Sequence, residues 1–317
     1  MRAVTYARFG PPEVLQVGQA PKPAPRAKEV LIRVHAATVC KEDPDMRAAP
    51  GFNGLLKPRH PILGQEFAGE VEAVGPGASQ FRPGDRVFGI DAFGAYAEYK
   101  SLSEDAALAL MPAGLSYAEA ASVPNGALTA LPFLRDHGHV RRGQKVLVHG
   151  ASGSVGTAAV QLARVYAAEV TGVCSTPNLE LVRSLGAGHV VDYTREDFTR
   201  QGHTYDLIFD AVGKLSFAQC WDRLAEEGVY LTVVPRPDIL LRGLWASLAG
   251  GRQARFAATG LRPARQKAED LDFVRGLIEA GQFRPVIDRH YPLEQVAAAH
   301  RYVQGGHKKG NVVITID

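Results

Sequence analysis

The residues with the clearest chemical meaning are the small ones in the segment 146–156, VLVHGASGSVG. A β-branched run leads into a glycine-rich turn that opens a stretch of helical spacing, which is the context a dinucleotide-binding turn requires. Gly153 would let a pyrophosphate approach the backbone, and Gly156 would let the helix pack closely on the strand. Ser154 and Val155 would present free N–H groups to an anion. The segment predicts dinucleotide binding; the alternative is a tight turn whose small residues serve packing alone.

The end of the next predicted strand indicates which dinucleotide binds. An NAD enzyme usually places Asp or Glu about 20 residues after the turn, where the carboxylate binds the ribose. Here residues 173–176 read VCST and contain no acid. A carboxylate would repel a 2′-phosphate, whereas small hydroxyl groups hydrogen-bond it, so the sequence favours NADPH. Arg183 and Arg195 are candidate charges for that phosphate, or simply parts of a solvated face.

Alternating strands and helices must position this turn, and the pattern from residue 117 onward predicts them. The predicted strands are 145–149, 170–174, 189–192, 206–210 and 228–234, and the predicted helices are 116–137, 154–168, 178–186 and 215–227. Such alternation is typical of a doubly wound parallel sheet with helices on both faces. We therefore predict an α/β dinucleotide-binding domain over residues 121–261.

The rest of the chain reads as a β-rich domain. Short strand-like runs lie between Gly and Pro residues at 3–6, 29–36, 69–73, 86–90 and 95–99. The tail adds predicted helices at 265–281 and 293–305 and predicted strands at 286–288 and 311–316. A terminal strand must pair with another, and we expect it to return to the N-terminal sheet. This predicts one discontinuous domain, residues 1–120 together with 262–317.

The composition argues against several classes of protein. The 317 residues suggest about two domains, and 46% apolar and 22% charged residues are ordinary globular values. A net charge of +3 with scattered basic residues argues against nucleic acid as a partner. Three cysteines, a small and odd number, fit reduced thiols in a cytoplasm. No apolar run is long enough to span a membrane, and the stretch 240–248 is more consistent with core or dimer packing.

The chain also resembles a known family over nearly all of its length. The motifs that carry the resemblance are FGPPEVL at 9–15, GQEFAGEV at 64–71, PGDRVFG at 83–89, GAYAE at 94–98, VP with TA over 123–130, VCST at 173–176, LGA at 185–187 and RPVI at 284–287. Together they are similar to the zinc-independent quinone oxidoreductases of the medium-chain dehydrogenase/reductase superfamily. The resemblance implies a GroES-like β domain and a Rossmann domain, with the site in the cleft between them and NADPH as hydride donor.

The resemblance also implies roles for single residues. Thr129 matches the threonine near the nicotinamide, Ser175 the residue at the 2′-phosphate, and Tyr193 the residue beside the adenosine. Lys309 precedes the last strand, where a lysine suits a cofactor phosphate or a charged sheet edge. The complete set of predicted cofactor contacts is Thr129, Gly150, Ser152, Gly153, Ser154, Val155, Gly156, Ser175, Tyr193 and Lys309.

Cys40 raises the question of a metal. In zinc alcohol dehydrogenases of the same superfamily, Cys-x-x-Asp at this place supplies a zinc ligand, and Cys40-Lys-Glu-Asp43 looks like that motif. The histidine that follows in those enzymes is replaced by Gln65, and no acid, His or Cys stands near residues 124–126. Catalytic zinc needs three protein ligands, so we expect no metal here. Cys40 is instead expected to be a half-buried thiol lining the cofactor pocket.

These features predict an NADPH-dependent reductase of quinones or α,β-unsaturated carbonyl compounds. The cofactor would transfer a hydride to a carbon conjugated with a carbonyl, and the protein would bind and orient both reactants. Cys40, Asp43 and Gln65 are predicted to line the site, together with Tyr96. The alternatives are a zinc-type alcohol dehydrogenase and a non-catalytic NADPH-binding regulatory protein. Relatives are usually homodimers, and residues 253–258 are the expected edge strand of such a dimer.

Overall fold

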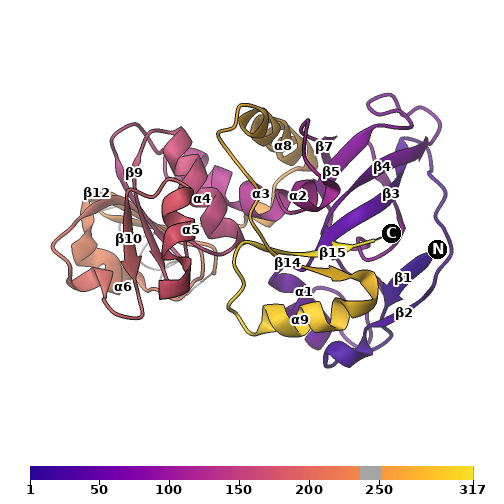
Figure 1. The fold of residues 1–317 in the computed structure, drawn as a ribbon, viewed down its shortest axis with the longest axis horizontal. Helices are drawn as coiled ribbons and strands as arrows, with labels where there is room; N and C mark the ends of the chain where they lie inside the picture. The colour runs from indigo at the N-terminus through magenta and orange to yellow at the C-terminus, as the bar shows by residue number, and fades with distance from the viewer. Residues whose placement is uncertain (236–250, 317) are drawn as a thin grey trace. The chain divides into compact units, whose positions relative to one another are not determined.

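The computed structural model describes residues 1–235 and 251–316. The chain forms two compact units (Figure 1): unit 1 comprises Met1–Asn125 and Pro263–Asp317, and unit 2 comprises Gly126–Arg262. The apolar stretch 240–248 lies outside the described residues. Within the described ranges, no helix is both long and apolar enough to cross a membrane.

Unit 2 is built on a six-stranded parallel sheet. Its strands are β8 (Lys145–His149), β9 (Glu169–Cys174), β10 (His189–Asp192), β11 (Tyr205–Asp210), β12 (Leu224–Thr232) and β13 (Gln253–Phe256). They lie in the order β10-β9-β8-β11-β12-β13, and every neighbouring pair is parallel. In chain order this is the 3-2-1-4-5-6 arrangement of the doubly wound dinucleotide-binding fold. The predicted Rossmann domain is therefore confirmed.

Helices lie between the strands of both units (Figure 1), and α2 and α6 begin at capping boxes formed by Ser116 and Ser216. The α-helices of the described residues are α1 (Glu42–Ala48), α2 (Tyr117–Ala121), α3 (Pro124–Pro132), α4 (Ser154–Val165), α5 (Leu179–Ser184), α6 (Phe217–Cys220), α8 (Ala264–Glu279) and α9 (Val296–Gln304). A π-helix covers Phe133–His137, and 3-10 turns lie at Pro12–Val14, Thr176–Asn178, Phe198–Arg200, Trp221–Arg223, Thr259–Leu261 and Leu293–Gln295.

Two predicted helices are wrong in extent. The helix expected over 116–137 is divided into α2, α3 and the π-helix, because Pro124 has no N–H to continue the hydrogen bonds of α2. The helix expected over 215–227 is only α6 and one 3-10 turn. Strand β12 begins inside the predicted helix, at the fully buried Leu224, which pairs with Tyr205 of β11. Burial in the sheet overrides the local helical pattern there.

Unit 1 contains a seven-stranded sheet and a separate hairpin pair. The pair is β1 (Arg2–Thr5) with β2 (Gln16–Gln19), and the sheet comprises β3 (Glu29–Thr38), β4 (Glu66–Val74), β5 (Arg86–Ile90), β6 (Tyr99–Ser103), β7 (Ala107–Leu110), β14 (Ile287–Pro292) and β15 (Asn311–Thr315). The sheet order is β14-β15-β3-β4-β5-β7, and β6 pairs with β3. The last strand, β15, runs antiparallel to β3. The expected return of the terminal strand to the N-terminal sheet is therefore confirmed.

Two strands of unit 1 differ from prediction. The strand expected at 95–99 starts only at Tyr99, because Tyr96 lies in the core and its backbone bonds to Leu63 and Val4 outside the ladder. The strand expected at 286–288 extends to Pro292 through its parallel pairing with β15.

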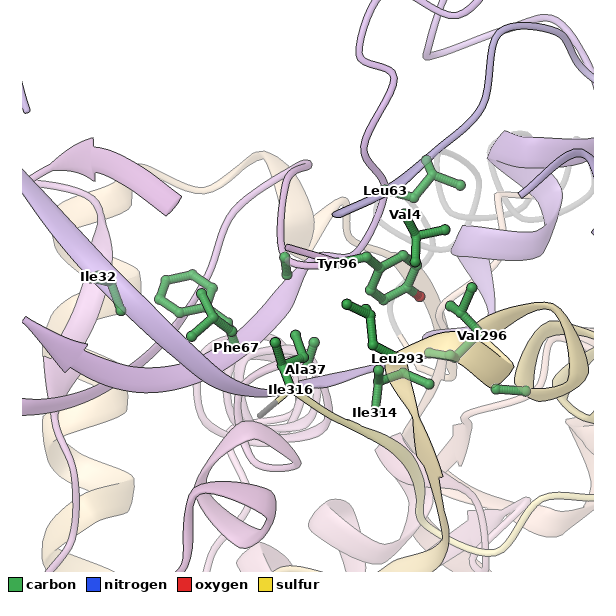
Figure 2. Close-up of a cluster of buried hydrophobic side chains, with 14 of the residues drawn as sticks. Val4, Ile32, Ala37, Leu63, Phe67, Tyr96, Leu293, Val296, Ile314 and Ile316 are labelled. Carbon is green, nitrogen blue, oxygen red and sulfur yellow. The ribbon is translucent and has the colours of Figure 1, made fainter. Parts of the chain in front are cut away.

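The core of unit 1 lies where the sheet meets α9 and the first strand. Figure 2 shows Tyr96 among Val4, Leu63, Leu293 and Val296, all of them buried. Because these side chains come from both ends of the chain, burying them couples the N-terminal and C-terminal segments. The same core fixes the end of β3 and the start of β4, where the candidate polar residues of this unit lie.

Candidate functional site

The glycine-rich turn of unit 2 is pinned to the end of the neighbouring strand. Gly150 has a left-handed backbone with φ of 78°. The N–H groups of Gly150 and Ala151 both donate to the carbonyl of Val173 in β9, at 3.1 and 3.0 Å. A Cβ on Gly156 would lie 2.1 Å from the carbonyl oxygen of Gly150, so only glycine lets α4 begin this close to the turn. The turn is thus a rigid link between β8 and α4.

The surface of this turn fits a pyrophosphate. A Cβ on Gly153 would meet nothing nearer than the Gly150 carbonyl oxygen at 3.6 Å, so the backbone there is open to a close ligand. Gly153 precedes α4, whose first residues are Ser154 and Val155. The Oγ atom of Ser154 is buried with no hydrogen-bond partner among the described residues. The open backbone at Gly153 and the free N–H groups of a helix start are a suitable donor set for phosphate oxygens.

The end of β9 carries the residues predicted to meet the adenosine half of the cofactor. Ser175 directly follows β9, and Tyr193 directly follows β10 and is 55% exposed. The Tyr193 N–H donates to the Cys174 carbonyl at 3.1 Å, which keeps the two strand ends together. Asn178 donates its amide Nδ2 to the Oγ atoms of Ser152 at 3.1 Å and of Ser175 at 3.2 Å. Asn178 therefore ties the turn to the strand end.

An acid does lie near this region, at the end of the third strand and not the second. Asp192 accepts hydrogen bonds from the hydroxyl groups of Thr176 at 2.5 Å and Thr194 at 2.7 Å. The Thr176 hydroxyl, followed by that of Thr194, holds the pKa of Asp192 below its usual value. Its carboxylate is thus engaged by neighbouring hydroxyl groups.

The remaining predicted cofactor contacts are divided between the two units. Thr129 is half-buried in α3 and belongs to unit 2. Lys309 belongs to unit 1, where its side chain is exposed and its backbone N–H donates to Asp288 at 3.0 Å. The structure brings together the turn, Ser175 and Tyr193 within unit 2, whereas Lys309 is held on the other unit.

In unit 1, Cys40 takes part in a buried hydrogen-bond network around Glu66. The Cys40 thiol donates to Glu66 Oε2 at 3.1 Å, and the Thr38 hydroxyl donates to the same oxygen. The backbone N–H of Asn125 donates to Glu66 Oε1 at 2.6 Å. Cys40 is only 2% exposed, so the expectation of a half-buried thiol is wrong: the end of β3 and the start of β4 enclose it.

A second buried carboxyl lies beside the first. The backbone N–H of Cys40 and the phenol of Tyr96 donate to Asp43 Oδ2 at 2.8 and 3.1 Å, and Asp43 Oδ1 has no partner among the described residues. Burial raises the pKa of Asp43 to about 7. Asp43 is thus able to hold or release a proton near neutral pH.

Burial also shifts the pKa values of Glu66 and Cys40 in the same network. It raises the pKa of Glu66, although the hydrogen bonds from Thr38 and Asn125 oppose that shift. It raises the pKa of the Cys40 thiol well above its usual value, and the negative charge of Glu66 adds to the effect. Cys40 is therefore a neutral donor at neutral pH and not a thiolate.

Gln65 is half-buried beside this network, and its Nε2 lies buried with no partner among the described residues. Across the described ranges, no group of three or more His, Cys, Asp or Glu side chains is placed to hold a metal ion. A spare amide donor at Gln65 suits a carbonyl oxygen better than a cation, because an N–H group donates to the oxygen and repels the metal.

Sequence reasoning missed several polar residues of these sites. Glu66 stands inside the quoted GQEFAGEV motif, but its burial depends on the register of β4. His149 and Asp210 end β8 and β11, and these adjacent parallel strands bring His149 Nδ1 within 2.9 Å of Asp210. That pair had a signal, since both residues close predicted strands at the same sheet edge. Asn178 had none, because it reads as an ordinary helix start.

Comparison with known proteins bears out the resemblance. Residues 26–133 match the family described as alcohol dehydrogenase GroES-like domain, and residues 185–314 match the family described as zinc-binding dehydrogenase. The quinone oxidoreductase of Pongo abelii is 32% identical over 328 residues, covering 100% of this chain and 98% of that protein. The chloroplastic NADPH-dependent alkenal/one oxidoreductase of Arabidopsis thaliana is 32% identical over 335 residues, covering 99% of this chain and 79% of that protein.

A solved structure agrees with these relatives. The quinone oxidoreductase from Coxiella burnetii matches with a TM-score of 0.87 and 31% identity, over 100% of this chain and 99% of that one. The 3-2-1-4-5-6 sheet of unit 2 agrees with the two matched families, the curated relatives and the solved Coxiella structure. The chain therefore belongs to the quinone oxidoreductase-like proteins of the medium-chain dehydrogenase/reductase superfamily, and it is a nicotinamide-dependent oxidoreductase with a GroES-like and a Rossmann domain.

Proposed function

We propose that this protein reduces quinones or α,β-unsaturated carbonyl compounds with NADPH and without zinc. The relatives support both substrate classes, since one is named a quinone oxidoreductase and another an NADPH-dependent alkenal/one oxidoreductase. Both classes contain an electrophilic carbon conjugated with a carbonyl, to which a bound reduced nicotinamide supplies a hydride. We assign the cofactor to unit 2 and the substrate-facing residues to unit 1.

The observation that carries the proposal is the arrangement of neutral donors at the end of β9. Ser152 and Ser175 are bridged by Asn178, and no acidic residue follows β9 before α5. A ribose hydroxyl is usually bound by an acid at this place, whereas hydroxyl donors suit a 2′-phosphate. The donor set therefore supports NADPH in preference to NADH.

Unit 1 is proposed to supply the residues that line the substrate side of the site. Gln65, which precedes β4, is partly exposed, whereas Cys40 after β3 and Asp43 in α1 are enclosed and would support the site from within the unit. The Tyr96 phenol holds Asp43 in place, and Asp43 retains or releases a proton near neutral pH. Zinc independence is supported by Gln65, which stands where the zinc enzymes have a histidine and is not a zinc ligand.

Cofactor titration and turnover test the proposal. We expect NADPH to bind at least about tenfold tighter than NADH by fluorescence titration, because one charge-assisted phosphate contact is worth about 1.4 kcal/mol. NADPH consumption is then followed with a panel of quinones and enones, with and without a chelator. Equal affinity for the two cofactors would refute the preference. Activity lost in chelator would favour a zinc-type dehydrogenase, and binding without any turnover would favour a regulatory protein.

We also propose a homodimer located in the cytoplasm. Strand β13 ends the described sheet of unit 2 and offers an edge for pairing with a second copy. The three cysteines are all free and buried, which fits a reducing compartment.

A further inference from the structure

Asn178 occupies the N-cap position of α5, but its side chain does not cap the helix. The 3-10 turn Thr176–Asn178 runs directly into α5, so the extended residue before the helical segment is Ser175, and Asn178 already has a helical backbone. Here the side chain is 7% exposed and turned away from the helix, toward two serines that lie 23 residues apart in the chain. The side chain of Asn178 therefore makes a contact between the glycine-rich turn and the end of β9 and not a contact within its own helix.

The direction of these hydrogen bonds decides what the serines can do. Asn178 Nδ2 carries two hydrogens and donates toward Ser152 Oγ at 3.1 Å and Ser175 Oγ at 3.2 Å. Each hydroxyl oxygen then accepts from Asn178 and keeps its own hydrogen for another partner. With the amide reversed, both serines would donate to Asn178 and would turn lone pairs toward a ligand. An anion is attracted by the first arrangement and repelled by the second.

Each neighbouring arginine has an exposed side chain that faces an acidic residue, so neutral donors matter at this place. Arg183 Nη1 contacts Glu180 at 2.5 Å, and Arg195 Nε lies 3.8 Å from Asp192. Ser175 follows β9 at the distance from the glycine-rich turn where dinucleotide-binding proteins contact the 2′ position of the ribose, and Ser152 lies in the turn itself. By this rule Ser152 is expected at the pyrophosphate and Ser175 at the 2′-phosphate of NADPH.

We propose that Asn178 is a positioning residue that orients the Ser152 and Ser175 hydroxyl groups as paired hydrogen donors to the pyrophosphate and the 2′-phosphate of NADPH. This rests on the proposed function, because it takes NADPH as the ligand. Asn178 acts through the serines and sets cofactor preference without adding charge. The two hydrogen bonds from Nδ2 favour this amide orientation, and the Oδ1 atom is buried without a partner among the described residues.

Calorimetric titration of the full chain with two fragments tests the assignment. Adenosine 2′-monophosphate reports on the Ser175 side, ADP reports on the Ser152 side, and adenosine is the phosphate-free control. Asn178→Ala should weaken both phosphate-bearing ligands about threefold to tenfold. Asn178→Asp has the same shape but only accepts hydrogen bonds, so it should weaken them by more than about tenfold. Adenosine affinity should change little in either variant.

A double-mutant cycle separates positioning from simple bracing of the loop. In a Ser175→Ala background, Asn178→Ala should cause no further loss of adenosine 2′-monophosphate affinity, because the hydroxyl it orients is gone. Equal losses with and without Ser175, or unchanged affinities in both Asn178 variants, would overturn the inference. Gln144→Glu makes the same amide-to-carboxylate change at the other end of β8 and should leave all affinities unchanged.

Two measurements keep the outcomes distinct. Thermal unfolding without ligand shows whether each variant is folded. If Asn178→Ala is not folded, Asn178→Ser takes its place. Wild-type protein that binds neither NADPH nor adenosine 2′-monophosphate would refute the proposed function. Wild-type protein that binds both, with Asn178 variants that do the same, would refute only the role of Asn178.

Discussion

The Tyr96 phenol donates a hydrogen bond to Asp43 Oδ2 at 3.1 Å, and both side chains are fully buried. The backbone N–H of Cys40 binds the same oxygen, so Asp43 joins the core of unit 1 to the end of β3. A carboxyl in this position can be neutral or charged at neutral pH, because burial brings its pKa to about 7. Its protonation is therefore coupled to the stability of the unit.

Replacing Asp43 by Asn should remove one part of the pH dependence of folding. Folded Asp43 keeps its proton up to about pH 7, whereas the unfolded chain loses it near pH 4, so the folded state binds more protons between these values. The free energy of unfolding should therefore contain a term that falls as pH rises from about 4 to about 7. Each unit of pKa difference is worth about 1.4 kcal/mol. Urea unfolding at several pH values should show that Asp43→Asn lacks this term. Asp45→Asn, an exposed change on the same helix, should keep it, and a slope unchanged in Asp43→Asn would contradict the assignment.

His300 should change the free energy of unfolding with pH in the direction opposite to Asp43. It is fully buried with both ring nitrogens unpartnered among the described residues, and burial lowers its pKa to about 3. In the unfolded chain this histidine is protonated below about pH 6.5, whereas in the folded chain it stays neutral down to about pH 3. The free energy of unfolding should therefore decrease as pH falls from about 6.5 to about 3. His300→Phe should flatten that loss in urea unfolding, while the exposed His307→Phe should not. Equal acid sensitivity of His300→Phe and wild type would show that the buried ring is not responsible.

Gly156→Ala should disrupt the cofactor turn. The new Cβ would lie 2.1 Å from the Gly150 carbonyl oxygen, which forces α4 away from the turn. We expect destabilisation of a few kcal/mol and a large loss of NADPH affinity, measured by thermal unfolding and fluorescence titration. The matched control is Gly276→Ala in α8, where the Cβ has no neighbour within 4 Å and the change should be neutral or slightly stabilising. A stable Gly156→Ala protein that binds NADPH normally would rule out this role of the glycine.

Ser175→Asp should reverse the cofactor preference. A carboxylate at the end of β9 repels a 2′-phosphate and can instead accept from a ribose hydroxyl. NADPH affinity should fall at least about tenfold, and NADH affinity should hold or rise, in fluorescence titrations. Ser184→Asp adds the same charge at an exposed position of α5 and should leave the ratio unchanged. Parallel losses for both cofactors would place the 2′-phosphate elsewhere.

The edge strand β13 should carry the dimer interface. Phe256 ends this strand, which pairs with β12 on one side only in the described sheet. Phe256 also packs against the buried core of unit 2, so thermal unfolding must first show that Phe256→Lys is folded. The folded variant should then shift the mass from dimer to monomer in light scattering at micromolar concentration. Phe273→Lys, at a half-exposed site of α8, is the control. A monomeric wild type would overturn the dimer, and a dimer that survives Phe256→Lys would move the interface to another surface.

The amino-acid sequence by itself determined the features that arise from local spacing. The glycine-rich turn at 146–156 and the alternation of strands and helices in unit 2 followed from periodicity and turn residues. The return of the last strand followed from the requirement that a terminal strand pair with another. The family motifs then indicated the two domain types and the kind of cofactor. The turn, the periodicity and the motifs are readable because each one is contained within a short stretch of the chain.

Only the tertiary structure decided which polar side chains meet. Glu66 and Cys40 are 26 residues apart, and Tyr96 and Asp43 are 53 apart, so their hydrogen bonds depend on how β3, β4 and the core pack. Burial decided that β12 starts at Leu224 and that Asp43 titrates near neutral pH. The orientation of Asn178 likewise depends on the turn that β8 and β9 bring to it. Hydrogen-bond partners and desolvation are set by the three-dimensional neighbourhood, which no local pattern of residues encodes.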